Sequence, residues 1–202
     1  MRLHSKILFA LATATALSAA PLSFDFKDPK GVNNAVFKLD APLEAINGTA
    51  NGVSGTLSFD PENPSKTTGS IVVGTGSLHV ANPMMKDHML GAQWLDAAAH
   101  PEIRFEIARI GAVKADGGNF SGEVTGKFTL HGVTKEITVP VKATYLKDKL
   151  GMRVPNQKGD LLVLRSTFTV KRSDYGINPG APQDKVSDEI EITLSLAGAS
   201  PR

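Results

Sequence analysis

The feature that most constrains this chain is a strict alternation of apolar and polar residues in short segments between Ala35 and Leu196. In the clearest segment, Phe120 to Leu130, every even-numbered residue is apolar or glycine and every odd-numbered residue is polar or charged. Successive side chains of a β-strand point to opposite faces, so a segment of this kind has one dry face and one wet face. The alternation therefore predicts half-buried strands over most of the chain.

The spacing of these segments indicates how the strands are arranged. Short strands, about eight in all and regularly spaced, favour an antiparallel barrel or sandwich over a parallel sheet. Turn residues separate them, as in the hairpin signal Asp116–Asn119. The apolar phase reverses between Val73 and Leu78, where Gly74 and Gly76 predict a bulge or a bend at a barrel corner. We find no repeat and no linker, and we expect one all-β domain.

One short α-helix is predicted over residues 83–96, where the alternation stops. Pro83 suits a first helical turn. Apolar residues then recur at helical spacing, at Met85, Met89, Ala92 and Leu95. Methionine is flexible and polarisable, and it adapts to irregular surfaces. Two interpretations stay open: these residues and Trp94 plug one end of the core, or they form a lid over the mouth of a cavity.

The N-terminus predicts a secretory signal peptide over residues 1–20, followed by a single domain over residues 21–202. Basic residues precede an apolar run from Ile7 to Leu17, and small residues allow cleavage after Ser18 or Ala20. The apolar run is too short for a comfortable membrane span. We therefore expect a periplasmic or secreted protein without an integral membrane span.

Charge and cysteine content exclude several classes of partner. The chain has 22 Lys and Arg against 20 Asp and Glu, and removal of Arg2 and Lys6 with the leader balances the two signs. A neutral domain without basic clusters has no electrostatic reason to bind nucleic acid or anionic lipid surfaces. The chain has no Cys, so the core alone must stabilise a domain of roughly 180 residues.

An enzyme is the weaker interpretation of this sequence. His88 lies beside Asp87, so a base and a carboxylate could form a pair. The sequence contains neither a Gly-x-Ser-x-Gly elbow nor a phosphate-binding glycine loop before a helix. The histidines lack the short spacings of metal ligands, and no metal or cofactor is expected. We interpret His131 as structural, fixing the turn that follows it through backbone hydrogen bonds.

Three glycines on dry faces bear on whether the interior is open. Gly55, Gly122 and Gly126 occupy positions where a packed core would normally carry Val, Ile or Leu. Their missing side chains leave room for a ligand, or they relieve the coiling of strands in a tight barrel. Both interpretations stay open.

Six pieces of sequence carry a resemblance to a known family. In order they are Phe59–Pro64 (FDPENP), Lys86–Leu90 (KDHML), Gln93–Asp96 (QWLD), His100–Phe105 (HPEIRF), Phe128–Lys135 (FTLHGVTK) and Lys171–Gly176 (KRSDYG). With these pieces the chain resembles the YceI-like family, exported bacterial proteins with a lipocalin-like β-barrel that bind polyisoprenoid or similar long lipids. The resemblance covers nearly all of the mature chain. It departs from the commoner pattern at Asn33–Asn34, where typical members carry a His-Ser or His-Thr pair.

The resemblance implies an antiparallel lipocalin-like β-barrel and a long-chain apolar lipid as partner. We expect a polyisoprenoid, quinone or fatty-acyl chain to be held in the barrel interior without covalent chemistry, by a monomer or homodimer. The predicted lining is formed by inward-facing residues, Phe105, Ile107, Val124, Phe128, Val139, Val141, Phe168 and Ile192. The predicted mouth carries Met85, Met89 and Trp94.

Two interpretations stay open for the role of Arg172, and the overall function also has alternatives. Arg172 either pairs with Asp174 across a turn and closes the barrel end, or holds the polar head of a ligand. The alternative functions are a solid-cored stress or interaction module that binds no small ligand and, less expected, a hydrolase-type enzyme that uses Asp87 and His88.

Overall fold

The structure is a computed structural model that describes residues 20–202. Except for Ala20, the predicted signal peptide lies outside the described residues. The strands are β1 (Leu22–Asp25), β2 (Asn34–Asp40), β3 (Ala45–Ala50), β4 (Val53–Phe59), β5 (Thr68–Gly74), β6 (Leu78–Val80), β7 (Glu102–Ile110), β8 (Lys114–Asp116), β9 (Asn119–Leu130), β10 (Val133–Leu146), β11 (Gly159–Lys171) and β12 (Glu189–Pro201). The helices are α1 (Pro83–Leu90) and α2 (Leu150–Arg153), and three 3₁₀ turns are η1 (Pro64–Lys66), η2 (Thr75–Ser77) and η3 (Arg172–Tyr175).

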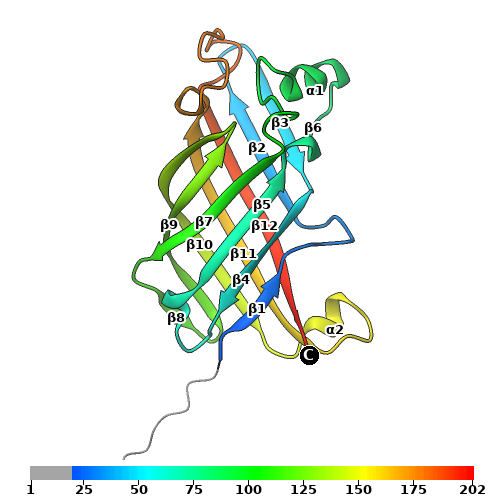
Figure 1. Ribbon diagram of the computed structural model, residues 1–202, viewed down its shortest axis with the longest axis vertical. Coiled ribbons are helices and arrows are strands. Elements are labelled where there is room, and N and C mark those ends of the chain that lie inside the picture. Colours follow the sequence, from blue (N-terminus) through cyan, green and yellow to red (C-terminus); the bar gives the residue numbers. More distant parts are fainter. Residues whose placement is uncertain (1–19) are drawn as a thin grey trace, which may run out of the picture.

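The strands close into one antiparallel barrel with eight positions around the ring (Figure 1). Closure occurs because β1 pairs with β4 on one side and with β12 on the other. At three of the eight positions, two short strands lie end to end and together take the place of one long strand. These pairs are β1 with β2, β3 with β4, and β5 with β6. The predicted antiparallel barrel is therefore confirmed. Figure 1 shows α1 and the loop after η3 at the upper end of the barrel, and β8 and α2 at the lower end.

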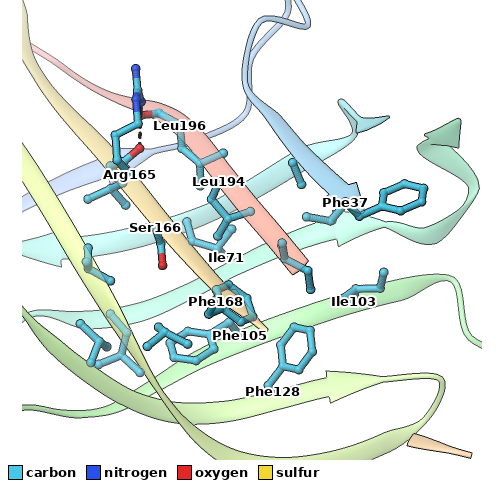
Figure 2. Close-up of a pocket in the computed structure, with 18 of the residues that line it drawn as sticks. Phe37, Ile71, Ile103, Phe105, Phe128, Arg165, Ser166, Phe168, Leu194 and Leu196 are labelled. Carbon is cyan, nitrogen blue, oxygen red and sulfur yellow. Dashed lines mark hydrogen bonds between the residues drawn. The ribbon is translucent and has the colours of Figure 1, made fainter. Parts of the chain in front are cut away.

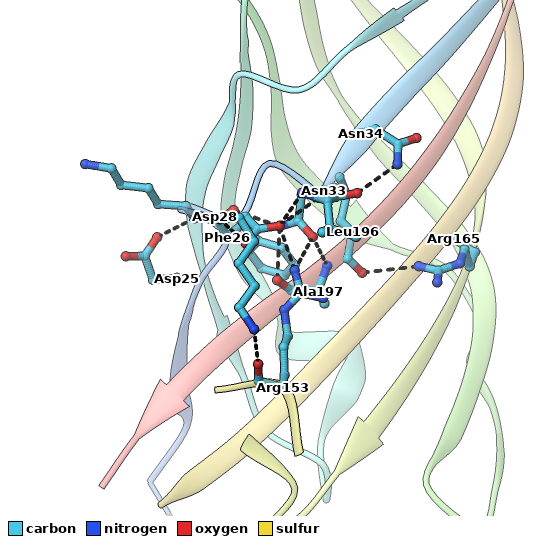
Figure 3. Close-up of polar contacts among 12 residues, drawn as sticks. Asp25, Phe26, Asp28, Asn33, Asn34, Arg153, Arg165, Leu196 and Ala197 are labelled. Atoms are coloured by element: carbon cyan, nitrogen blue, oxygen red, sulfur yellow. Dashed lines mark hydrogen bonds and ion pairs between the residues drawn. The ribbon is translucent and has the colours of Figure 1, made fainter. Parts of the chain in front are cut away.

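Asn33 fills the interruption between β1 and β2 (Figure 3). Its side-chain amide donates to the carbonyl oxygen of Ala197 at 3.0 Å and accepts from the N–H of Ala197 at 2.8 Å. This side chain therefore takes the place of a strand residue beside β12, and it is buried. Asp28 accepts the backbone N–H of Asn33 and forms an ion pair of 2.7 Å with Arg153, which ties α2 to the same place.

The alternating residues separate as the sequence predicts. On β9, Val124, Phe128 and Leu130 are buried inside the barrel, while Glu123 and Lys127 are exposed. Buried side chains form an upper cluster around Phe128 and a lower cluster around Phe24, Phe59 and Leu162. The reversal of phase after Val73 coincides with η2, so the predicted bend between β5 and β6 is confirmed.

The helix predicted over residues 83–96 is shorter than expected. Asn82 caps its start by accepting the N–H of Met85, and α1 ends at Leu90. Gly91 has a low helix propensity, and its extended backbone stops the helix there. Residues 92–99 form turns instead, so Ala92 is exposed and does not continue the apolar face. The short α2 was not predicted by the pattern of the loop between Lys147 and Gly159.

Candidate functional site: an apolar cavity inside the barrel

The barrel encloses a cavity of about 260 Å³ (Figure 2). Inward-facing side chains from β2, β4, β5, β7, β9, β10, β11 and β12 line it, with aromatic rings such as Phe37, Phe105, Phe128 and Phe168 among them. All eight residues predicted to line the interior border this cavity: Phe105, Ile107, Val124, Phe128, Val139, Val141, Phe168 and Ile192. Contact of these residues with a ligand stays a prediction.

The predicted mouth residues lie at the upper end of the cavity. Met89 and Trp94 border the cavity, and so does the buried Leu95. Met85 does not border it and packs against the upper cluster of core residues. The segment from Met89 to Leu95 therefore covers the upper end, in a position that suits either a plug or a lid.

Arg172 borders the cavity, yet its guanidinium is occupied by the protein. The side chain is 1% exposed. Its N–H groups donate to carbonyl oxygens of the loop that follows η3, those of Ile177, Asn178, Ala181, Val186 and Ser187. A guanidinium has five N–H donors, and five carbonyls receive them here. The cation also lies over the ring of Trp94, 5.9 Å from its centroid. Arg172 therefore holds the upper loop over the barrel, and it has no donor left for the head of a ligand.

The predicted pairing of Arg172 with Asp174 is wrong. Asp174 forms its ion pair with Lys135 at 3.0 Å, because it faces β10 across the surface. A different carboxylate, Asp188, accepts both the N–H and the hydroxyl of Ser173. Burial alone would raise the pKa of Asp188, but these hydrogen bonds and the charge of Arg172 hold it below its usual value.

None of the histidines within residues 20–202 borders the cavity. Asp87 and His88 are exposed on α1 and do not border the cavity. His131 forms a hydrogen bond of 3.0 Å through Nδ1 with the carbonyl of Tyr175 and stacks edge-on with His100. It thus contacts backbone, as predicted, but it fixes η3 rather than its own turn. Within residues 20–202 no group of His, Asp and Glu is placed to hold a metal ion.

The three glycines have different roles. A Cβ on Gly126 would collide with the ring of Phe105 at 2.6 Å and with backbone of β7, so Phe105 occupies the space that Gly126 leaves. Gly55 has a φ of +118° and lies against the backbone of β5. Gly122 borders the cavity, but a Cβ there would lie 3.1 Å from the carbonyl oxygen of Ala112. Close approach of backbone or of a side chain therefore accounts for all three glycines.

At the lower end of the barrel a polar cluster lies beside an aromatic one. Tyr145 packs edge-on against Phe24, and its hydroxyl donates to Asp160 at 2.7 Å. Burial and this carboxylate raise the pKa of Tyr145 to about 12. Burial would raise the pKa of Asp160, but hydrogen bonds from Asp148 N–H, Tyr145 and Arg202 lower it. No motif in the sequence marked this cluster, because its members come from three separate segments.

An eight-stranded antiparallel barrel with few helices and an apolar interior defines a lipocalin-like class of protein. No helix within the described residues is long and apolar enough to cross a membrane. Comparison with known proteins identifies the family: the YceI-like domain matches residues 24–197, and the chain belongs to this family of binding-type barrels.

Relatives and solved structures agree with that assignment. The UPF0312 protein of Pseudomonas syringae pv. tomato is 33% identical over 197 residues, covering 94% of this chain and 95% of the relative. The crystal structure of BcnA from Burkholderia cenocepacia has a TM-score of 0.66 at 22% identity, covering 82% of this chain and 95% of that one. A polyisoprenoid binding domain from Saccharophagus degradans has a TM-score of 0.64 at 11% identity, covering 90% of this chain and 99% of that one.

Proposed function

We propose that this protein binds a long apolar ligand, of polyisoprenoid, quinone or fatty-acyl type, inside the barrel and performs no covalent chemistry on it. The observation that carries the proposal is the cavity itself, whose wall is built from apolar side chains contributed by every position of the ring. Its polar neighbours, Thr67, Ser121, Arg165, Ser166 and Arg172, are few. A space of this kind favours burial of hydrocarbon and offers no nucleophile or acid–base pair.

The size of the cavity suits such a chain. A group the size of a water molecule needs about 10–15 Å³ of cavity volume. The cavity of about 260 Å³ therefore has room for roughly twenty such groups. Burial of ten to fifteen CH₂ groups contributes roughly 8–12 kcal/mol before entropic losses. Micromolar binding requires about 8 kcal/mol, so hydrophobic burial alone can provide it. The presence of this cavity also argues against the alternative interpretation, in which the protein has a solid core and binds no small ligand.

The comparisons support the ligand class, since one neighbour in fold is described as a polyisoprenoid binding domain. The pattern of residues 1–20, which predicts a signal peptide, supports export to the periplasm or beyond. We propose that the protein acts there as a carrier or store of its ligand, as a monomer or homodimer.

Titration with a fluorescent polyene fatty acid and with a dansyl-labelled isoprenoid tests the proposal. We expect saturable binding at one site per barrel with a Kd near or below micromolar. Absence of binding for both probes would contradict the proposal. His88→Ala should bind both probes as the wild type does, because His88 lies outside the cavity; loss of binding would revive the enzyme interpretation.

A further inference from the structure

The barrel wall is incomplete on one side, between β10 and β11. Only Lys142–Leu146 of β10 pairs with β11, opposite Leu161–Arg165. Above this point residues 133–141 of β10 and 166–171 of β11 have no pairing with each other, although both strands stay paired on their other sides, with β9 and β12. We name this unpaired stretch the seam.

Pro140 stands where the pairing stops. The backbone N–H of Tyr145, an odd-numbered residue of β10, donates to the carbonyl oxygen of Gly118, which lies on the β9 side. Along a strand, the backbone N–H and C=O groups of successive residues point alternately to one neighbouring strand and to the other. Even-numbered residues of β10 therefore direct their backbone groups toward β11, and the nitrogen of Pro140, which carries no hydrogen, is one of them. A proline at this position prevents the ladder from extending upward by one more pair.

A single side-chain hydrogen bond spans the seam at the same height. The hydroxyl of Ser166 donates to the carbonyl oxygen of Pro140 at 2.7 Å. Ser166 is a polar residue at an inward position of β11, between Leu164 and Phe168, where the alternation would place an apolar one. Figure 2 shows its side chain on the wall of the pocket.

The cavity reaches the seam. Leu164, Arg165 and Ser166 all border it, although successive residues of a strand face opposite sides of a closed wall. On the adjoining strands Val141 and its partner Gly122, which has no side chain, border it as well. The interior therefore extends to the strand edge at the height of Pro140.

The two ends of the barrel offer a poorer route. The upper end is covered by Trp94 and Leu95 and by the loop that the Arg172 hydrogen bonds hold. The lower end contains the packed rings of Phe24, Phe59 and Tyr145, although the cavity reaches its rim beside Pro64 and Thr67. Opening either end breaks many contacts. Between β10 and β11 themselves, parting the seam breaks the Ser166–Pro140 hydrogen bond. At the top of the seam the exposed ion pair of Lys135 with Asp174 also links β10 to η3, and exposed ion pairs contribute little to stability. Segments with few such interactions open most readily.

We propose that the apolar chain of the ligand enters and leaves the cavity sideways through the seam, with the Ser166–Pro140 hydrogen bond as its latch. This inference rests on the proposed function and adds the path by which the ligand enters and leaves the cavity. The seam supplies an opening along a strand, which lets a long chain enter lengthwise beside Val141 and Phe168.

Cysteine pairs provide the test, because the natural chain has no Cys. Continuing the register of Lys142 with Arg165 places Thr138 opposite Thr169, so Thr138→Cys with Thr169→Cys locks the seam by a disulfide or, if the gap is wide, by a bis-maleimide. The matched control is Thr167→Cys with Thr193→Cys, across strands that are already paired. Stopped-flow fluorescence with the polyene fatty acid measures uptake and release.

We expect the locked protein to take up and release the probe at least about tenfold more slowly, at a similar Kd, and reduction of the disulfide to restore the rate. The cross-linked control should exchange at the wild-type rate. Ser166→Ala, compared with Thr169→Ala, should accelerate both steps about 2- to 10-fold, since one hydrogen bond is lost from the closed state. Wild-type exchange rates in the fully cross-linked seam would overturn the inference. They would place the entrance at the lower rim, where Pro64, Thr67 and Val113 reach the cavity. Failure of the unmodified protein to bind any probe would instead overturn the proposed function.

Discussion

Replacement of Arg172 by lysine should destabilise the protein strongly while leaving ligand binding intact. The five N–H donors of Arg172 meet five carbonyl oxygens, and a lysine ammonium has only three donors. At least two carbonyls then lose their partner, at about 1–3 kcal/mol each for buried groups. Arg172→Lys should therefore lower the free energy of unfolding by about 2–6 kcal/mol, a large share of the roughly 5–15 kcal/mol available to a domain.

Urea denaturation and thermal melting measure this effect. The single tryptophan, Trp94, lies against Arg172 and reports on the upper end by fluorescence, while far-UV circular dichroism reports on the whole barrel. A drop of roughly 5–20 °C in Tm is expected for a domain of this size. The matched control is Arg109→Lys, at an exposed site on β7 that does not border the cavity, with a change of at most about 0.5 kcal/mol. Unchanged stability of Arg172→Lys, together with weaker binding of anionic lipids, would refute the structural role and restore Arg172 as a ligand residue.

Three further predictions concern the interior, the backbone and pH. Val124→Trp should fill the cavity and abolish probe binding in fluorescence titrations with the fold retained, whereas Trp at the exposed Lys127 should not; unchanged binding would contradict the assigned lining. Gly126→Ala should lower the free energy of unfolding by about 1–3 kcal/mol through overpacking, while Gly76→Ala, with open space around it, should be nearly neutral in urea titrations. The folded-state pKa of Asp160 is lowered, so its stabilisation is present above the unfolded value near 3.9 and is lost as the pH falls through the folded pKa. Asp160→Asn should therefore be less stable than the wild type at pH 7 and show a smaller loss of stability on acidification; an unchanged pH profile of unfolding would argue against these hydrogen bonds.

The residues on the cavity wall were predictable because they follow a local rule. On β9, the period of two assigns Val124 and Phe128 to the interior whatever the neighbouring strands are, and closure of the barrel then brings them to the same space as Phe105 and Phe168. The bend at Gly74 was predictable for the same reason, since a change of phase is visible within a few residues.

The contacts that close the barrel depend on distant segments and were not predictable in this way. The sequence places Asp174 two residues from Arg172, but the acceptors of Arg172 lie in the loop 177–187 and are backbone carbonyls, which no residue pattern reveals. Asn33 likewise pairs with Ala197 at the other end of the chain. The seam left two local signs, a proline within the alternating segment of β10 and the inward Ser166, but only the pairing of strands shows that both lie at one gap.

The central claim is that the barrel holds an apolar ligand in its cavity. Native mass spectrometry of the protein purified from its own host, followed by solvent extraction and lipid identification, tests this most directly. We predict one bound molecule per barrel that extracts into organic solvent and carries a long hydrocarbon chain. A bare protein mass that also stays bare after incubation with isoprenoid, quinone and fatty acid would contradict the account.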